Sequence, residues 1–191
     1  TPQTLINIRP VVAALKESGQ WENTVLVFFS DHGEMLGSHG LYQKQLPYEE
    51  SINIPMIVHD PRLAANRRGA VVADPVCTED FYPTTLGLAG IPQRAPKPGL
   101  DLTGCIHSGA ALPRDGVYIE FVEEDRPSMV FFGMTWRGLR TRTHKYTVLD
   151  GKPWQLFDLL RDPYEQKNLV ASPEHAELRR RLHAELRRVA A

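Results

Sequence analysis

The sequence is poor in cysteine, and it shows no long hydrophobic run, no excess of charge and no visible signal peptide. Its 191 residues include two cysteines, Cys77 and Cys105, which are too few for a disulfide framework. No apolar run approaches the roughly 20 residues that cross a bilayer. The net charge of −1 offers no basic surface for nucleic acid or for an anionic membrane. Residues 1–4 resemble no part of a signal peptide.

What the sequence contains is the composition of a globular protein, organised around residues 25–55. The apolar run 25–29 ends at Ser30 and is followed by Asp31 and His32. A run of this length, bounded by turn residues, predicts a parallel strand that is buried on both faces. Because ligands of open α/β sheets lie beyond the carboxyl ends of the strands, we expect Asp31 and His32 to lie at a site.

The preceding segment predicts an amphipathic helix. Leu5, Ile8, Val12 and Leu15 fall three or four residues apart, and Gly19 marks the helix end. A helix with no strand before it suggests that the chain starts inside a domain. The other elements predicted in this part are strands at 55–58 and, unless it is an extended connection, at 71–76, a helix from Thr78 or Asp80 to Leu88, and an irregular segment at 92–104.

After residue 113 the pattern changes to alternating strands. Residues 117–121 alternate apolar with polar side chains, and Asp150-Gly151 is a hairpin signal. We therefore predict two units, residues 1–112 and residues 113–191, the second being a small antiparallel sheet with one packed helix. Its further predicted elements are strands at 129–134, 139–143, 145–149 and 154–157, and a helix that starts at Ser172-Pro173 and contains Leu178, Leu182, Leu186 and Val189.

Four residues near the first strand are able to carry chemistry. Asp31 and His32 offer half the ligand shell of a divalent cation, although an isolated pair is more often a turn cap beside a solvated imidazole. Lys44 is able to neutralise an anionic ester, or is a solvated surface lysine. His39 is suited to general acid catalysis, or bonds its own loop backbone.

Charged residues of the second unit are assigned to the surface. We expect His144 and Lys145 to be exposed turn residues, although both are able to reach across to the site. Asp158, Asp162 and Glu165 surround a turn without the regular spacing of a calcium loop, so they are interpreted as turn and surface residues.

Taken together, these motifs resemble those of the type I sulfatases of the alkaline phosphatase superfamily. The resemblance implies an α/β fold, in which residues 1–112 form the C-terminal half of a doubly wound α/β/α catalytic domain. Residues 113–191 then form the C-terminal subdomain, an antiparallel sheet plus helix. The matching segments are 23–37, His39-Gly40-Leu41, Lys44, 48–51, Pro55, Asp80, 83–85, 90–92, 139–141, Lys145-Tyr146, 156–159, Asp162-Pro163, Glu165 and Asn168-Leu169.

The resemblance also implies roles for the four residues. Asp31 and His32 match metal ligands, with calcium as the first expectation and magnesium or manganese as alternatives. Lys44 matches the lysine that contacts the sulfate, and His39 matches a histidine near the substrate entrance.

The nucleophile of this family is a formylglycine made within a C-x-P/A-x-R motif. Neither Cys77 nor Cys105 begins such a motif, so we expect the formylglycine in an N-terminal half that lies outside this chain.

The resulting hypothesis is the C-terminal part of a sulfuric ester hydrolase that acts on small-molecule or saccharide sulfate esters and is inactive alone. The alternatives are a phosphonate monoester or phosphodiester hydrolase and a non-catalytic binding or structural module. Neither nucleic acid nor a membrane span is expected. An apolar face near residues 5–15 and 25–29 is expected to be exposed, or covered by the N-terminal half or a second copy. The choice between cytoplasm and a periplasmic or secreted location stays open.

Overall fold

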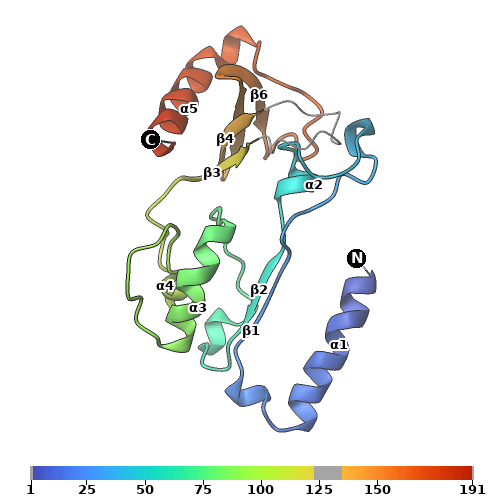
Figure 1. Cartoon of the computed structure of the whole chain (residues 1–191), viewed down its shortest axis with the longest axis vertical. Helices are drawn as coiled ribbons and strands as arrows, with labels where there is room; N and C mark the ends of the chain where they lie inside the picture. Colours follow the sequence, from blue (N-terminus) through green and yellow to red (C-terminus); the bar gives the residue numbers. More distant parts are fainter. Residues whose placement is uncertain (1, 123–134, 191) are drawn as a thin grey trace.

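The computed structural model describes residues 2–122 and 135–190, with side chains from residue 8 onward, so the strand expected at 129–134 lies outside the described residues. A two-stranded part with most of the helices lies below a four-stranded sheet that packs on one helix (Figure 1). Within the described residues, no helix has the length and apolar character needed to cross a membrane.

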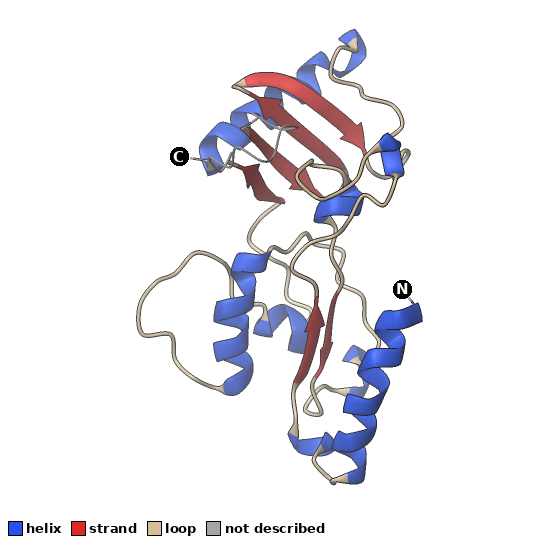
Figure 2. Ribbon diagram, turned by 45° about the vertical axis from the view of Figure 1, so that its right-hand side comes forward, coloured by secondary structure: helices blue, strands red, loops and turns tan. Residues whose placement is uncertain are grey.

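The N-terminal part is built on two short antiparallel strands. Helix α1 (Pro2–Glu17) ends before Gly19, whose φ is +74°, and is followed by the 3₁₀ turn η1 (Trp21–Asn23). Strand β1 (Leu26–Phe29) pairs with β2 (Met56–His59). Helix α1 lies on one side of this pair, and helices α3 (Phe81–Ala89) and α4 (Thr103–Ser108) lie on the other (Figures 1 and 2). The mixed α/β architecture is as predicted.

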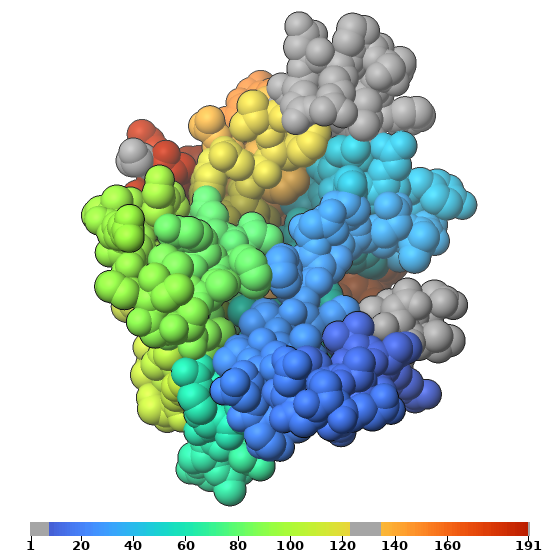
Figure 3. All heavy atoms as spheres, turned by 60° about the horizontal axis from the view of Figure 1, so that its bottom comes forward, coloured from blue at the N-terminus to red at the C-terminus, as the bar shows by residue number. Residues whose placement is uncertain are grey.

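The setting of β1 differs from the prediction of a parallel strand buried on both faces. It pairs antiparallel with β2 because residues 30–55 return the chain without a crossover helix. Phe29 of β1 is 39% exposed and Ile57 of β2 is 62% exposed. In the space-filling view, residues around β1 meet those of α3 (Figure 3), where the rings of Phe29 and Phe81 lie 4.3 Å apart.

The connections hold short helical turns. Residues 71–76 form an extended connection rather than a third strand. Gly90 ends α3 with a φ of 67°, as its position after the apolar run predicts. The irregular segment ends earlier than expected, because residues 103 and 104 already belong to α4. The short elements are η2 (Ser38–Gly40), α2 (Glu49–Ile52), η3 (Ala65–Arg67) and η4 (Thr78–Asp80).

The C-terminal part is an antiparallel sheet in the order β3-β4-β5-β6. Asp150 and Gly151, with φ values of 47° and 77°, form the predicted turn between β5 and β6. The remaining elements are β3 (Gly116–Phe121), β4 (Trp136–Thr141), β5 (His144–Leu149), β6 (Lys152–Asp158), η5 (Pro173–His175) and α5 (Ala176–Val189). The predicted sheet with one packed helix is confirmed, while the boundary at residue 113 stays a prediction.

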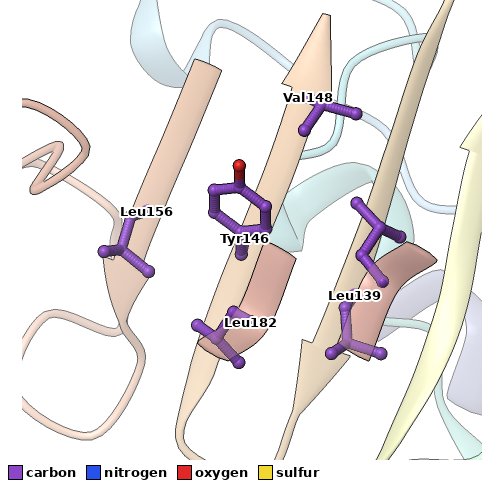
Figure 4. Packing of buried hydrophobic residues seen from close by; sticks show 6 residues of the cluster. Leu139, Tyr146, Val148, Leu156 and Leu182 are labelled. Atoms are coloured by element: carbon purple, nitrogen blue, oxygen red, sulfur yellow. The ribbon is translucent and has the colours of Figure 1, made fainter. Parts of the chain in front are cut away.

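The two faces of this sheet differ in chemistry. One face packs on α5 through an apolar cluster (Figure 4). Because side chains alternate along a strand, Arg140 and Lys145 point to the opposite face, toward α2. The apolar cluster consists of Leu139, Tyr146, Val148, Leu156, Leu182 and Leu186.

Candidate active site

Three side chains converge at the end of β1. The Nδ1 of His32 lies 2.7 Å from the carbonyl oxygen of Gly33, which can only accept, so Nδ1 carries the proton. The other ring nitrogen, Nε2, therefore presents a lone pair. It lies 3.4 Å from Oδ2 of Asp31 and accepts a hydrogen bond from Nζ of Lys44. The imidazole lone pair thus lies between a carboxylate and an ammonium group.

The site is polar and open to solvent. The side chains of Asp31 and His32 are 82% and 37% exposed. The backbone N–H of His32 donates to Oδ1 of Asp31 at 2.9 Å and lowers the pKa of that carboxyl group, which is therefore ionised at neutral pH. Asp31, His32 and Lys44 line one cleft of about 660 Å³, between the end of β1, residues 72–79 and strands β3 and β4.

The donor set fits part of a divalent cation site. A carboxylate oxygen and an imidazole nitrogen are suitable ligands, and the unprotonated Nε2 of His32 faces the carboxylate of Asp31. Two ligands are fewer than the six to eight oxygens that calcium usually takes. Among the described residues, no three His, Cys, Asp or Glu side chains are grouped to hold a metal ion. The described residues therefore offer no more than part of a cation's ligand shell.

Close backbone packing explains the glycine that follows His32. The N–H of Gly33 donates to the carbonyl of Ser51 at 2.8 Å, and the N–H of Glu34 donates to the carbonyl of Glu50 at 2.9 Å. A Cβ on residue 33 would lie 1.9 Å from the Glu50 oxygen, so only glycine fits. The hydroxyl of Ser51 in turn donates to the carbonyl of Lys44. Ser51 thereby links the two halves of the site, a role that its place in the sequence does not indicate.

His39 lies apart from the other three residues. It belongs to η2, has a φ of 54°, and does not line the cleft. Its ring stacks on Tyr48 with centroids 4.0 Å apart, and its Nε2 lies 3.9 Å from Oε1 of Glu50. The Nε2 is buried and finds no hydrogen-bond partner among the residues that the structure describes. The structure therefore brings together Asp31, His32 and Lys44, but not His39.

The expectation that Lys145 and Glu165 are exposed is wrong. Both side chains are 0% exposed, and they form an ion pair with each other. The strand pattern placed Lys145 on the face opposite the apolar one. That second face is covered by α2, so Lys145 is buried. Glu165, whose φ is 53°, accepts a hydrogen bond from the backbone N–H of Glu49 at 2.8 Å. These contacts join the C-terminal sheet to the segment that carries Lys44.

A protein-family model matches most of the chain. The family described as "N-sulphoglucosamine sulphohydrolase, C-terminal" matches residues 37–191. Among curated relatives, an ulvan-active sulfatase of Formosa agariphila is 34% identical over 176 residues, which are 86% of this chain and 32% of the relative. An arylsulfatase of Clostridium perfringens is 33% identical over 168 residues, 86% of this chain and 33% of the relative. The chain therefore spans about a third of the length of the curated relatives that it matches.

Solved structures show the same fold. A protein solved in complex with its substrate D-glucosamine-2-N,6-O-disulfate superposes with a TM-score of 0.78 at 26% identity, over 96% of this chain and 37% of that chain. A phosphonate monoester hydrolase of Agrobacterium radiobacter has a TM-score of 0.81 at 26% identity, over 95% of this chain and 38% of that chain. The similarity covers both the strand pair and the C-terminal sheet.

Proposed function

Because this chain belongs to the sulfatase family whose model describes the C-terminal region of N-sulphoglucosamine sulphohydrolase, we propose that it forms the C-terminal part of a sulfuric ester hydrolase. The observation that carries this proposal is the convergence of Asp31, His32 and Lys44 on one cleft. A carboxylate and an ammonium group beside an imidazole lone pair suit a site that binds a cation and an anion together.

Each of the three residues has a proposed role. Asp31 and His32 hold two positions of a divalent cation, with calcium preferred over magnesium or manganese. When bound, the cation supplies positive charge at the ester oxygens. The Lys44 ammonium contacts the sulfate and stabilises negative charge that develops as the alcohol leaves. The contact between His39 and substrate, expected from the resemblance, stays a prediction.

The nucleophile is proposed to lie outside this chain. Burial raises the pKa of the Cys77 thiol, which disfavours a reactive thiolate, and neither cysteine begins a C-x-P/A-x-R motif. We propose a formylglycine in an N-terminal half that also covers the exposed edge of β1, so this chain alone is inactive and binds metal weakly. The names of the relatives favour a sulfated saccharide as the substrate.

A manganese titration tests the cation site on this chain alone. Bound Mn²⁺ is expected to broaden the NMR signals of the His32 ring, and Asp31→Asn is expected to raise the Mn²⁺ dissociation constant about tenfold. Asp115→Asn, which changes an exposed carboxylate elsewhere, is the matched control. Equal broadening in the parent chain and both variants would contradict the cation site.

Activity is tested in the longer protein that contains this chain. We expect hydrolysis of an aryl sulfate, with kcat lowered by about 10² to 10³ in Lys44→Met because one charged donor to the anion is lost. A phosphonate monoester hydrolase is the second candidate, favoured by the TM-score of 0.81 to such an enzyme. A preference for an aryl phosphonate over the matched aryl sulfate would select it, and no turnover of either would support a non-catalytic module.

A further inference from the structure

The sheet face opposite α5 carries a buried group of charges. Lys145 and Glu165 are 0% exposed and paired, and Nζ of Lys145 lies 3.8 Å from Oε1 of Glu49. Burial lowers the pKa of Lys145 and raises that of Glu165, with each partner opposing the effect on the other. A buried ion pair often stabilises a fold no better than apolar side chains of the same volume. The buried pair is therefore better explained by a role in fixing the position of the segment that it contacts.

The buried pair and two further side chains of the same sheet face contact one short segment, residues 45–49. The indole Nε1 of Trp136 donates to the carbonyl of Gln45 at 2.8 Å. Nη2 of Arg140 donates to Oε2 of Glu49 at 3.0 Å, and Glu165 accepts the backbone N–H of Glu49 at 2.8 Å. Glu49 is therefore held at its backbone and at its carboxylate, from two strands and from the turn after β6.

This segment leads directly to the candidate active site. Glu49 begins α2, which also contains Ser51. Ser51 donates its hydroxyl to the carbonyl of Lys44 and accepts the backbone N–H of Gly33. A shift of α2 would therefore move Lys44 and the backbone next to His32 together. Since Gln45 adjoins Lys44, the contact from Trp136 fixes the backbone immediately after it.

We propose that the C-terminal sheet positions the Lys44 ammonium beside the His32 ring, through four positioning residues that we call the clamp. The clamp sets the distance between the anion-binding ammonium and the cation-binding imidazole. This inference rests on the proposed function only for what those two groups bind. The clamp residues are Trp136, Arg140, Lys145 and Glu165.

The test compares losses of one hydrogen bond on the two faces of the sheet. Trp136→Phe removes the donor to Gln45 and keeps an aromatic ring. Tyr146→Phe is the matched control, because it removes the hydroxyl that lies 2.9 Å from Nδ1 of His183 on the α5 face. A second clamp variant, Lys145→Met combined with Glu165→Gln, removes the ion pair without leaving one charge buried alone.

The readout is the NMR contact between the side chain of Lys44 and the ring of His32, together with the ¹⁵N shifts that report the His32 tautomer. We expect Trp136→Phe to halve the contact intensity or reduce it further, and to shift the ¹⁵N signals toward a tautomer average. The double variant should do the same, while Tyr146→Phe leaves both signals unchanged. Unchanged signals in Trp136→Phe, or an equal change in Tyr146→Phe, would overturn the clamp.

A kinetic measurement separates positioning from general support of the fold. In the longer protein, misplacing Lys44 should lower kcat at least tenfold in Trp136→Phe with KM nearly unchanged, because the ammonium acts most strongly on the charge of the transition state. Parental kcat in this variant would count against the clamp. If the parent protein turns over neither sulfate nor phosphonate, the proposed function fails, and the NMR comparison still decides the clamp.

Discussion

Replacing Gly33 by alanine is the sharpest test of how the site is built. The added Cβ would lie 1.9 Å from the carbonyl oxygen of Glu50, 2.9 Å from its carbonyl carbon and 3.1 Å from that of Ser51. All three atoms belong to the backbone, so no flexible side chain is able to move away. The loop after β1 must therefore separate from α2.

The cost follows from the contacts that this separation breaks. The N–H of Gly33 and that of Glu34 lose their acceptors in α2, at about 1 kcal/mol for each hydrogen bond. The acceptor of the Gly33 N–H is the carbonyl of Ser51, a residue that is 2% exposed, so losing this one bond leaves a buried carbonyl without its partner and costs up to about 3 kcal/mol. We therefore expect Gly33→Ala to lower the free energy of unfolding by about 2–4 kcal/mol.

Urea unfolding, followed by circular dichroism, measures this cost. Gly104→Ala, in helix α4, is the matched control, because among the described residues its Cβ would meet only the Cβ of Ala110, at 3.9 Å. We expect that substitution to leave the stability unchanged or to raise it by up to about 1 kcal/mol. If Gly33→Ala matches the parent chain, the close packing of residues 33 and 50 is refuted. The His32 and Lys44 signals should change in the same variant.

Two further substitutions test other parts of the fold. Asp60 is buried, and its hydrogen bonds to Arg62 lower its pKa below the ordinary 3.8. The ionised carboxylate therefore stabilises the fold fully above that pH, and this stabilisation is lost as the pH falls toward the lower pKa of the folded state. Asp60→Asn should cost about 3 kcal/mol near neutral pH, with the difference from the parent narrowing in acid titrations followed by circular dichroism. Leu182→Ala should cost about 3 kcal/mol in urea unfolding because it empties part of the α5 core, whereas Leu160→Ala, at a residue that is 71% exposed, should stay within about 0.5 kcal/mol.

Local patterns were sufficient to predict most of the elements. A period of two along residues 144–149 and a period near 3.6 along residues 176–189 depend only on which side of each element is apolar. Gly90 and Gly151 were identifiable because both adopt a positive φ that side chains disfavour. These signals reside in neighbouring residues, so the sequence displays them directly.

The pairing of β1 and the burial of Lys145 were not predictable in this way. The apolar run 25–29 indicates a strand but contains no information on the direction of its neighbour. In β5, Lys145 alternates with Tyr146, and the pattern correctly placed them on opposite faces. Whether the second face is covered depends on α2, which lies about a hundred residues earlier, with Glu49 and Glu165 separated by 116 positions.

The same separation explains why an Asp-His pair alone is a weak indicator of a site. The positions of Asp31 and His32 depend on Gly33, which is their neighbour in the sequence. The position of Lys44 depends on α2 and on the C-terminal sheet. The contacts from Trp136 and Arg140 to residues 45 and 49 each span 91 positions. Such contacts form only when the C-terminal sheet has folded. The charge arrangement in the cleft is therefore a property of the folded sheet as much as of the motif after β1.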